Sequence, residues 1–230
     1  MLARYLAEYQ HQLLGAANPI QAAGMAAYMK QQFAFIGIPA PLRRKLVKNV
    51  EIAAATQCTE NELLELALAL WQQAEREYQL CAIDLLVRAE GRLGSAALPV
   101  LQQLICSKSW WDSVDLLASK VVGTLAKREA SVVHELDLWV TAPNLWLRRS
   151  AIIYQLSWKA DTDTARLFHA CLANAGDPDF FIRKAVGWAL RQYARSQPDL
   201  VRRFVAEHPL AKLSQREALN ALRKLAEAHR

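Results

Sequence analysis

The sequence predicts an all-α protein, an α-solenoid in which helix pairs stack side by side. In almost every segment, apolar residues recur at positions i, i+3, i+4 and i+7, as on one face of a helix. No convincing run alternates strictly between apolar and polar residues, as a half-buried strand would. The third observation is a repeat of about 35 residues, the length of a two-helix unit.

Periodicity and helix-start signals place the elements along the chain. The expected helices lie roughly at residues 2–14, 19–35, 41–54, 60–73, 75–91, 95–106, 109–126, 130–141, 144–158, 162–175, 178–195, 198–207 and 214–229. Four of them carry a start signal, either an N-cap residue followed by Pro or a capping box. These signals are Asn18-Pro19, Asp177-Pro178, Thr59 with Glu62, and Ser214 with Glu217.

The repeat is read from the residue that opens every second helix. These residues are Leu42, Tyr78, Trp111, Trp146 and Phe181, at spacings of 36, 33, 35 and 35 residues. A repeated helix pair can bury its apolar face only against its neighbours, so this spacing favours a solenoid. A non-repetitive helical bundle is the alternative.

Composition limits the class of protein. The chain has 230 residues, 53% of them hydrophobic, which suits one domain spanning residues 1–230 with a buried core. Its four cysteines lie far apart, so we expect no disulfide framework and no zinc site. The charged N-terminus is unlike a secretory signal, and no window is long and apolar enough to span a membrane. We therefore expect a soluble cytoplasmic protein, monomeric by default.

Lys and Arg outnumber Asp and Glu by 28 to 22, and basic residues recur at matching repeat positions. Three residues after the opening residues Leu42, Trp146 and Phe181 stand Lys45, Arg149 and Lys184, and one position earlier stand Arg44, Arg148 and Arg183. Stacked repeats would align them into a basic stripe facing a polyanion such as nucleic acid. Ordinary solvated residues on exposed helix faces are the alternative.

The segment Lys108–Asp115 is the strongest candidate for chemistry. It places two adjacent tryptophans and two aspartates at the start of a helix, and Trp111, Asp115, Arg149 and Trp188 fall at repeat offsets that share one helix face. Indole faces and a carboxylate suit a cationic or sugar-like ligand. Alternatively, the tryptophans fill core positions and the aspartates cap a helix. Phosphate-binding glycine loops, metal motifs and nucleophile motifs are not recognisable in the sequence.

Several segments together resemble the AlkD type of bacterial DNA alkylation repair glycosylases. The resemblance rests on Lys108–Asp115, on residues 146–152 and 180–191, and more weakly on residues 25–30, 35–44 and 75–79. It covers about residues 20 to 225. The family implies a solenoid of HEAT-like repeats that removes N3- and N7-alkylated purines from duplex DNA without flipping the base into a pocket.

The resemblance also implies roles for individual residues. Asp115 corresponds to the catalytic carboxylate, and Trp111 and Trp188 to the indoles that embrace the deoxyribose of the damaged nucleotide. Arg149 corresponds to an arginine that binds the DNA backbone, and Tyr28 to a tyrosine near the same site. We assign Asp112 to helix capping.

An alkylated purine is positively charged and leaves its sugar readily, so such a site needs no general acid, metal or cofactor. Asp115 would stabilise the oxocarbenium-like sugar and hold the attacking water. We therefore expect an enzyme, a DNA-alkylpurine glycosylase of base excision repair, working in the bacterial cytoplasm on nucleoid DNA. A DNA-binding solenoid without catalysis and a protein-binding HEAT scaffold are the alternatives.

Overall fold

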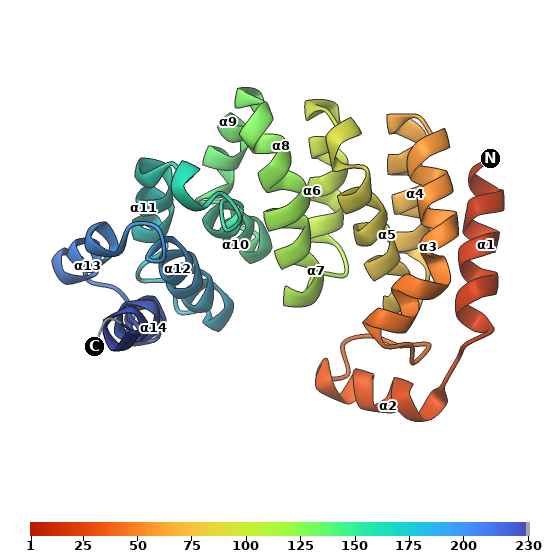
Figure 1. The fold of residues 1–230 in the computed structure, drawn as a ribbon, viewed down its shortest axis with the longest axis horizontal. Coiled ribbons are helices and arrows are strands. Elements are labelled where there is room, and N and C mark those ends of the chain that lie inside the picture. The colour runs from red at the N-terminus through yellow and green to blue at the C-terminus, as the bar shows by residue number, and fades with distance from the viewer. Residues whose placement is uncertain (229–230) are drawn as a thin grey trace. The chain divides into compact units, whose positions relative to one another are not determined.

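The computed structural model describes residues 1–228, and within that range the fold is all-α (Figure 1). An isolated bridge between Ala34 and Glu75 is the one β-type pairing recorded there. The all-α helical-repeat fold predicted from the sequence is therefore confirmed. The contacts divide the chain into two compact units, residues 1–100 and 101–230, and a single domain spanning residues 1–230 stays a prediction.

The first unit contains two layers of helices. Its elements are α1 (Leu2–Leu14), α2 (Pro19–Tyr28), α3 (Ala40–Gln57), α4 (Glu60–Gln72), α5 (Arg76–Arg88), η1 (Glu90–Arg92) and η2 (Ser95–Ala97), and α6 (Leu98–Cys106) begins at its end. Helix α3 packs on α1 and α5, and α4 packs on the same two helices. Figure 1 shows α2 lying across the lower end of these helices, and none of its residues is buried.

The second unit continues the same arrangement. Its elements are α7 (Trp111–Leu116), η3 (Leu117–Val122), α8 (Gly123–Arg128), α9 (Ala130–Trp139), α10 (Leu145–Ile153), η4 (Lys159–Asp161), α11 (Thr164–Ala173), α12 (Phe180–Tyr193), α13 (Pro198–Glu207) and α14 (Lys212–Ala228). Helices α7, α10, α12 and α14 pack successively on one another. Matching repeat positions therefore do become neighbours within this unit.

Two of the four helix-start predictions are confirmed and two are wrong. The side chain of Asn18 accepts the N–H of Gln21 in front of Pro19, and Thr59 forms the capping box with Glu62. Asp177 does not cap α12, because the next aspartate, Asp179, accepts its first N–H groups. The predicted Ser214–Glu217 box lies inside α14, which begins two residues earlier, at Lys212.

The helix expected at residues 19–35 ends at Tyr28, because Lys30 and Gln31 adopt left-handed backbone angles. The loop that follows is held by the buried carboxylate of Glu77. It accepts the N–H groups of residues 36, 37 and 38 at 2.9, 2.8 and 3.0 Å. Glu77 thereby fixes the backbone that joins α2 to α3.

The helix expected at residues 109–126 is interrupted by the π-helical turn η3, immediately after Asp115 and Leu116. Gly123 follows this turn, where a Cβ atom would lie 2.1 Å from the carbonyl oxygen of Tyr154. Only glycine permits so close an approach of the chain that leaves α10. Among the described residues, no helix has the length and apolarity that crossing a membrane requires.

Candidate active site

The centre of the candidate site is a two-pronged ion pair between neighbouring helices of the second unit. Arg149 on α10 donates from Nε to Oδ1 of Asp115 and from Nη2 to Oδ2, both at 2.7 Å. The Arg149 side chain is 5% exposed, whereas Asp115, near the end of α7, keeps 15% of its side chain exposed. The side chain of Asp115 is therefore held by two hydrogen bonds and remains partly exposed.

Arg149 also reaches a third helix, because its Nη1 donates to the carbonyl oxygen of Phe181 at the start of α12. One guanidinium thus joins α7, α10 and α12 at the same level of the stack. The sequence correctly placed Asp115 and Arg149 on a common face. It did not show that the carboxylate and the backbone carbonyl would satisfy all three arms of the arginine.

Two opposing effects act on the pKa of Asp115. Burial disfavours the charged form and raises the pKa above the ordinary value for aspartate. The hydrogen bonds and positive charge of Arg149 lower it, and the nearby charge of Asp112 raises it slightly further. The net shift is upward, so Arg149 offsets part of the cost of burying this carboxylate.

An aromatic cluster lies beside the ion pair. The rings of Trp110, Trp146 and Phe181 meet at centroid distances of 5.1 to 6.1 Å in tilted and edge-on arrangements. Trp110 and Trp146 therefore pack against each other, as the packing alternative allowed. The sequence did not predict that Phe181 belongs to this cluster. Its position as one of the residues that open the repeated helices was the available signal.

The two tryptophans predicted to act on substrate are both partly exposed. Trp111 is the first residue of α7, one helical turn before Asp115. Trp188 lies two turns into α12 and lines a cleft of about 320 Å³ together with residues from η3 and from the chain after α10. Neither indole belongs to the buried core, and their catalytic role stays a prediction.

Asp112 does not cap α7. The helix begins at Trp111 with Trp110 in the N-cap position, so Asp112 lies in the first turn. There its charge interacts favourably with the positive end of the helix dipole, which is a weaker role than the capping we assigned to it.

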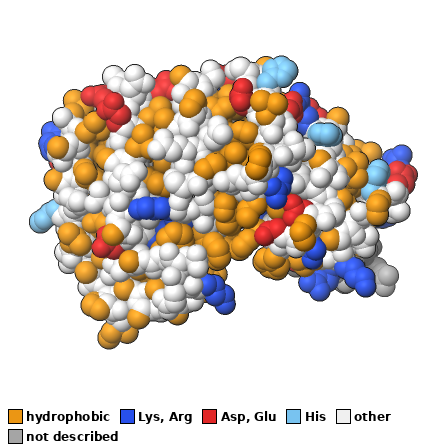
Figure 2. Space-filling view, turned by 180° about the vertical axis from the view of Figure 1, so that it is seen from behind, with side chains coloured by type: hydrophobic (Ala, Val, Ile, Leu, Met, Phe, Trp, Pro, Cys, Tyr) orange, Lys and Arg blue, Asp and Glu red, His pale blue; other side chains and the backbone are white. Residues whose placement is uncertain are grey.

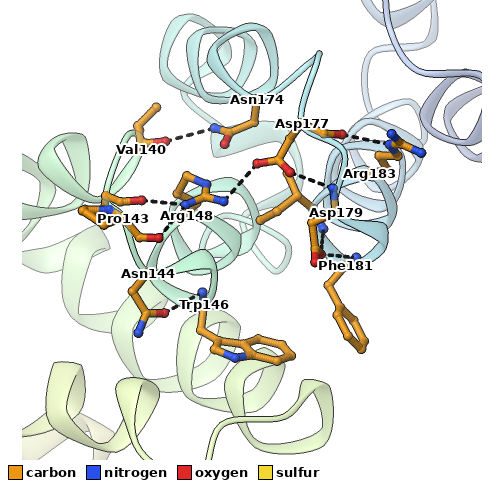
Figure 3. Close-up of polar contacts among 12 residues, drawn as sticks. Val140, Pro143, Asn144, Trp146, Arg148, Asn174, Asp177, Asp179, Phe181 and Arg183 are labelled. Atoms are coloured by element: carbon orange, nitrogen blue, oxygen red, sulfur yellow. Dashed lines mark hydrogen bonds and ion pairs between the residues drawn. The ribbon is translucent and has the colours of Figure 1, made fainter.

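Arg148 and Arg183 take part in a network that joins α10 to α12 (Figure 3). Arg148 pairs with Asp177 at 3.0 Å and donates to the carbonyl oxygens of Ala142 and Pro143. Arg183 donates from Nε to the carbonyl oxygen of Asp177 at 2.8 Å. Both arginines thus brace the turns before their own helices, and DNA binding by them stays a prediction.

The other predicted basic residues lie in both units. In the second unit, Lys184 pairs with Glu217 of α14 at 2.8 Å. In the first unit, Arg44 contacts Asp84 at 3.3 Å, and Lys45 is exposed. The predicted stripe across the repeats stays a prediction.

Tyr28 belongs to the first unit, where 69% of it is exposed at the end of α2. It lines an apolar hollow of about 380 Å³ together with Met25, Phe35 and Leu80. Exposed apolar side chains over α2 are visible at the lower left of Figure 2. Its predicted place beside the DNA lesion stays a prediction.

Groups of three or more His, Cys, Asp or Glu side chains that could hold a metal ion are absent from the described part of the chain. The cysteines described there are all free thiols.

Comparison with known proteins identifies the family. The family of DNA alkylation repair enzymes matches residues 9–222. A structure described as a predicted DNA alkylation repair enzyme from Enterococcus faecalis is 37% identical, with a TM-score of 0.85, over 90% of this chain and 97% of that one. No curated protein gave a match.

Two more distant structures share the fold. One is smu.31 from Streptococcus mutans UA159, 19% identical with a TM-score of 0.60 over 79% of this chain and 96% of that one. The other is AlkD2 from Streptococcus mutans, 18% identical with a TM-score of 0.61 over 76% and 88%. The family match spans the ion pair, both exposed tryptophans and the helical repeats that carry them. The chain belongs to the family of DNA alkylation repair enzymes.

Proposed function

We propose that this protein is a glycosylase that hydrolyses the N-glycosidic bond of cationic N3- and N7-alkylated purines in duplex DNA, without flipping the base into a pocket. Membership of the DNA alkylation repair family supports a role in alkylation repair. The observation that carries the glycosylase proposal is the carboxylate of Asp115, clamped by Arg149 on a side chain that remains partly exposed.

The clamp leaves acceptor capacity on Asp115. A carboxylate offers about four lone-pair positions, and the two donors of Arg149 occupy two of them. The remaining positions can accept the hydrogens of a water molecule and hold it against the sugar. As the glycosidic bond breaks, positive charge develops on the sugar, and the adjacent carboxylate stabilises it.

In this proposal Arg149 acts through Asp115. Its guanidinium keeps the buried carboxylate ionised against the desolvation that raises its pKa, and its contact with Phe181 fixes the direction of the clamp. The arginine is therefore a positioning residue. A guanidinium has five N–H donors, and the bonds to Asp115 and Phe181 use three of them, so the contact with the DNA backbone that the resemblance implied stays a prediction.

Trp111 and Trp188 are proposed to contact the deoxyribose from either side of the carboxylate. Indole faces attract cations, so they add to the stabilisation of the charged sugar. The site has no evident general acid for the departing base. It therefore suits a positively charged alkylpurine, which departs as a neutral base, and not an undamaged one.

The test is release of free 7-methylguanine and 3-methyladenine from methylated duplex DNA, measured by chromatography of the released bases. The wild-type protein is expected to release both and to leave unmethylated DNA intact. Asp115→Asn is expected to bind the duplex with little release. Duplex binding by the wild type without any base release would instead identify a non-catalytic DNA-binding protein.

A further inference from the structure

The cleft beside Trp188 has an unusual set of lining groups. Its polar walls come from η3, from the chain after α10, and from α12, and they include Lys120, Lys159, Gln192 and the Trp188 indole. No carboxylate lines it. The cleft therefore presents cations and N–H donors, with no acidic side chain to balance them.

Its two lysines are not neutralised elsewhere. Neither ammonium group forms an ion pair with a described side chain, whereas Arg149, Lys184 and Arg191 are each held by a carboxylate. In a second basic cleft of the same unit, by contrast, cations are paired with carboxylates. There Lys127 pairs with Asp161, and Arg166 pairs with Asp137 and Asp163.

Local structure holds the two lysines at one opening. Trp158 Nε1 donates to the carbonyl oxygen of Gly123 at 3.0 Å, and the hydroxyl of Ser157 donates to that of Ser119 at 3.2 Å. These bonds fasten the chain after α10 to the π-helical turn that carries Lys120. Lys159 itself has a left-handed backbone with φ of 56°, an unusual conformation for a residue with a side chain.

The cleft continues the face that carries the ion pair. Ser119 stands four residues after Asp115 and donates from its hydroxyl to the carbonyl oxygen of Asp115 at 2.6 Å, and Trp188 stands seven residues after Phe181 on α12. Residues at spacings of four and seven lie on the same side of a helix, one or two turns further along. At 1.5 Å per residue, Trp188 lies about 10 Å further along α12 than Phe181, whose carbonyl oxygen contacts Arg149.

We propose that this cleft binds a backbone phosphate of DNA next to the alkylated nucleotide. The proposal rests on the proposed function. Lys120 and Lys159 supply the charge, the Gln192 amide donates hydrogen bonds, and Trp188 holds the adjoining sugar. These residues lie outside the predicted basic stripe, which itself stays a prediction.

The test removes the two charges together, as Lys120→Gln with Lys159→Asn, since Asn tolerates the left-handed backbone at residue 159. The matched control is Lys127→Gln, an exposed lysine of the same unit that lies outside the cleft. Binding of unmethylated and methylated duplexes is measured by fluorescence anisotropy across a range of salt concentrations. Thermal melts verify that all variants fold.

The double variant is expected to lower the slope of log affinity against log salt by about one unit for both duplexes, and the control to leave it unchanged. In single-turnover excision, the protein concentration for half-maximal rate rises while the maximal rate is kept. If the double variant has the same slope as the control, the proposed phosphate site is overturned. Base release by the wild type would in that case still support the proposed function. A wild type that neither binds duplex nor releases base refutes both.

A second arm distinguishes the backbone phosphate from a free one. The indole N–H resonance of Trp188 is followed by NMR while the wild-type protein is titrated with duplex or with inorganic phosphate. The expected result is a shift at micromolar duplex and none at the same concentration of inorganic phosphate. A shift with micromolar inorganic phosphate and none with duplex would assign the cleft to a small phosphate ligand and overturn the proposal.

Discussion

Replacing Asp115 by Asn tests the mechanism most directly. The substitution removes the negative charge and keeps the size of the side chain. We expect the single-turnover rate of base release to fall roughly 10²-fold or more, as for other losses of one preorganised electrostatic group. Duplex binding should be kept or slightly strengthened, because a negative charge near the phosphates is removed.

The structure also predicts a cost in stability. Arg149 directs two donors at Asp115, and the Asn side chain can accept only one of them, since its NH₂ group is itself a donor. Removing one partner of a buried ion pair costs about 3–5 kcal/mol. In Asp115→Asn, Arg149 keeps one acceptor on the Asn side chain and another in the carbonyl oxygen of Phe181. We therefore expect the free energy of unfolding to fall by about 2–3 kcal/mol.

A matched control separates the loss of stability from the loss of catalysis. Asp177→Asn weakens a comparably buried pair, in which Asp177 meets Arg148 at 3.0 Å, and leaves Asp115 unchanged. Urea unfolding gives the stability of each variant, and excision is measured at saturating protein at a temperature where both are folded. Asp112→Asn is a second control and should keep most activity.

The mechanism is refuted if Asp115→Asn excises at a near-normal rate, or if Asp177→Asn loses as much activity as Asp115→Asn at equal stability. A folded but inactive Asp112→Asn would show that the wrong carboxylate was chosen.

Three further predictions concern the same site and the loop of the first unit. Because burial raises the pKa of Asp115, excision should decline on acidification at a higher pH than an exposed aspartate would give, and Asp115→Asn should lack this decline in its pH–rate profile. Trp111→Ala and Trp188→Ala should each lower the rate of excision by more than the loss of folding stability explains. A drop in melting temperature large enough to account for the loss of activity would instead indicate that these tryptophans act by packing. Glu77→Gln should lower the free energy of unfolding by about 1–3 kcal/mol without changing the rate of base release, because the amide cannot accept all three loop N–H groups; unchanged urea denaturation would contradict this.

The sequence by itself determined the helical class, the period of the repeat and the placement of Asp115 and Arg149 on a common face. Each follows from spacing, because the faces of stacked helices repeat at fixed offsets. The N-cap of α2 and the capping box of Thr59 could also be predicted from the sequence, since an N-cap side chain bonds only to residues two or three positions away. Such features need no knowledge of distant neighbours.

Tertiary structure decided which polar groups meet. Ser214 and Glu217 have the spacing of a capping box, yet Ser214 donates to the carbonyl oxygen of Arg183 and Glu217 accepts from Lys184 and Arg191. A side chain bonds to the nearest group that burial leaves without water, and neighbouring helices supply that group. Spacing along one helix does not reveal it.

Packing also separates the basic residues aligned by the sequence offsets from the two lysines of the cleft beside Trp188. Sequence offsets aligned Arg149 and Lys184 as candidates for DNA phosphates, but packing placed a carboxylate against each of them. Lys120 and Lys159 share no offset. They share an opening because a π-helical turn and the irregular chain after α10 bring them there, and neither irregularity has a periodic signal in the sequence.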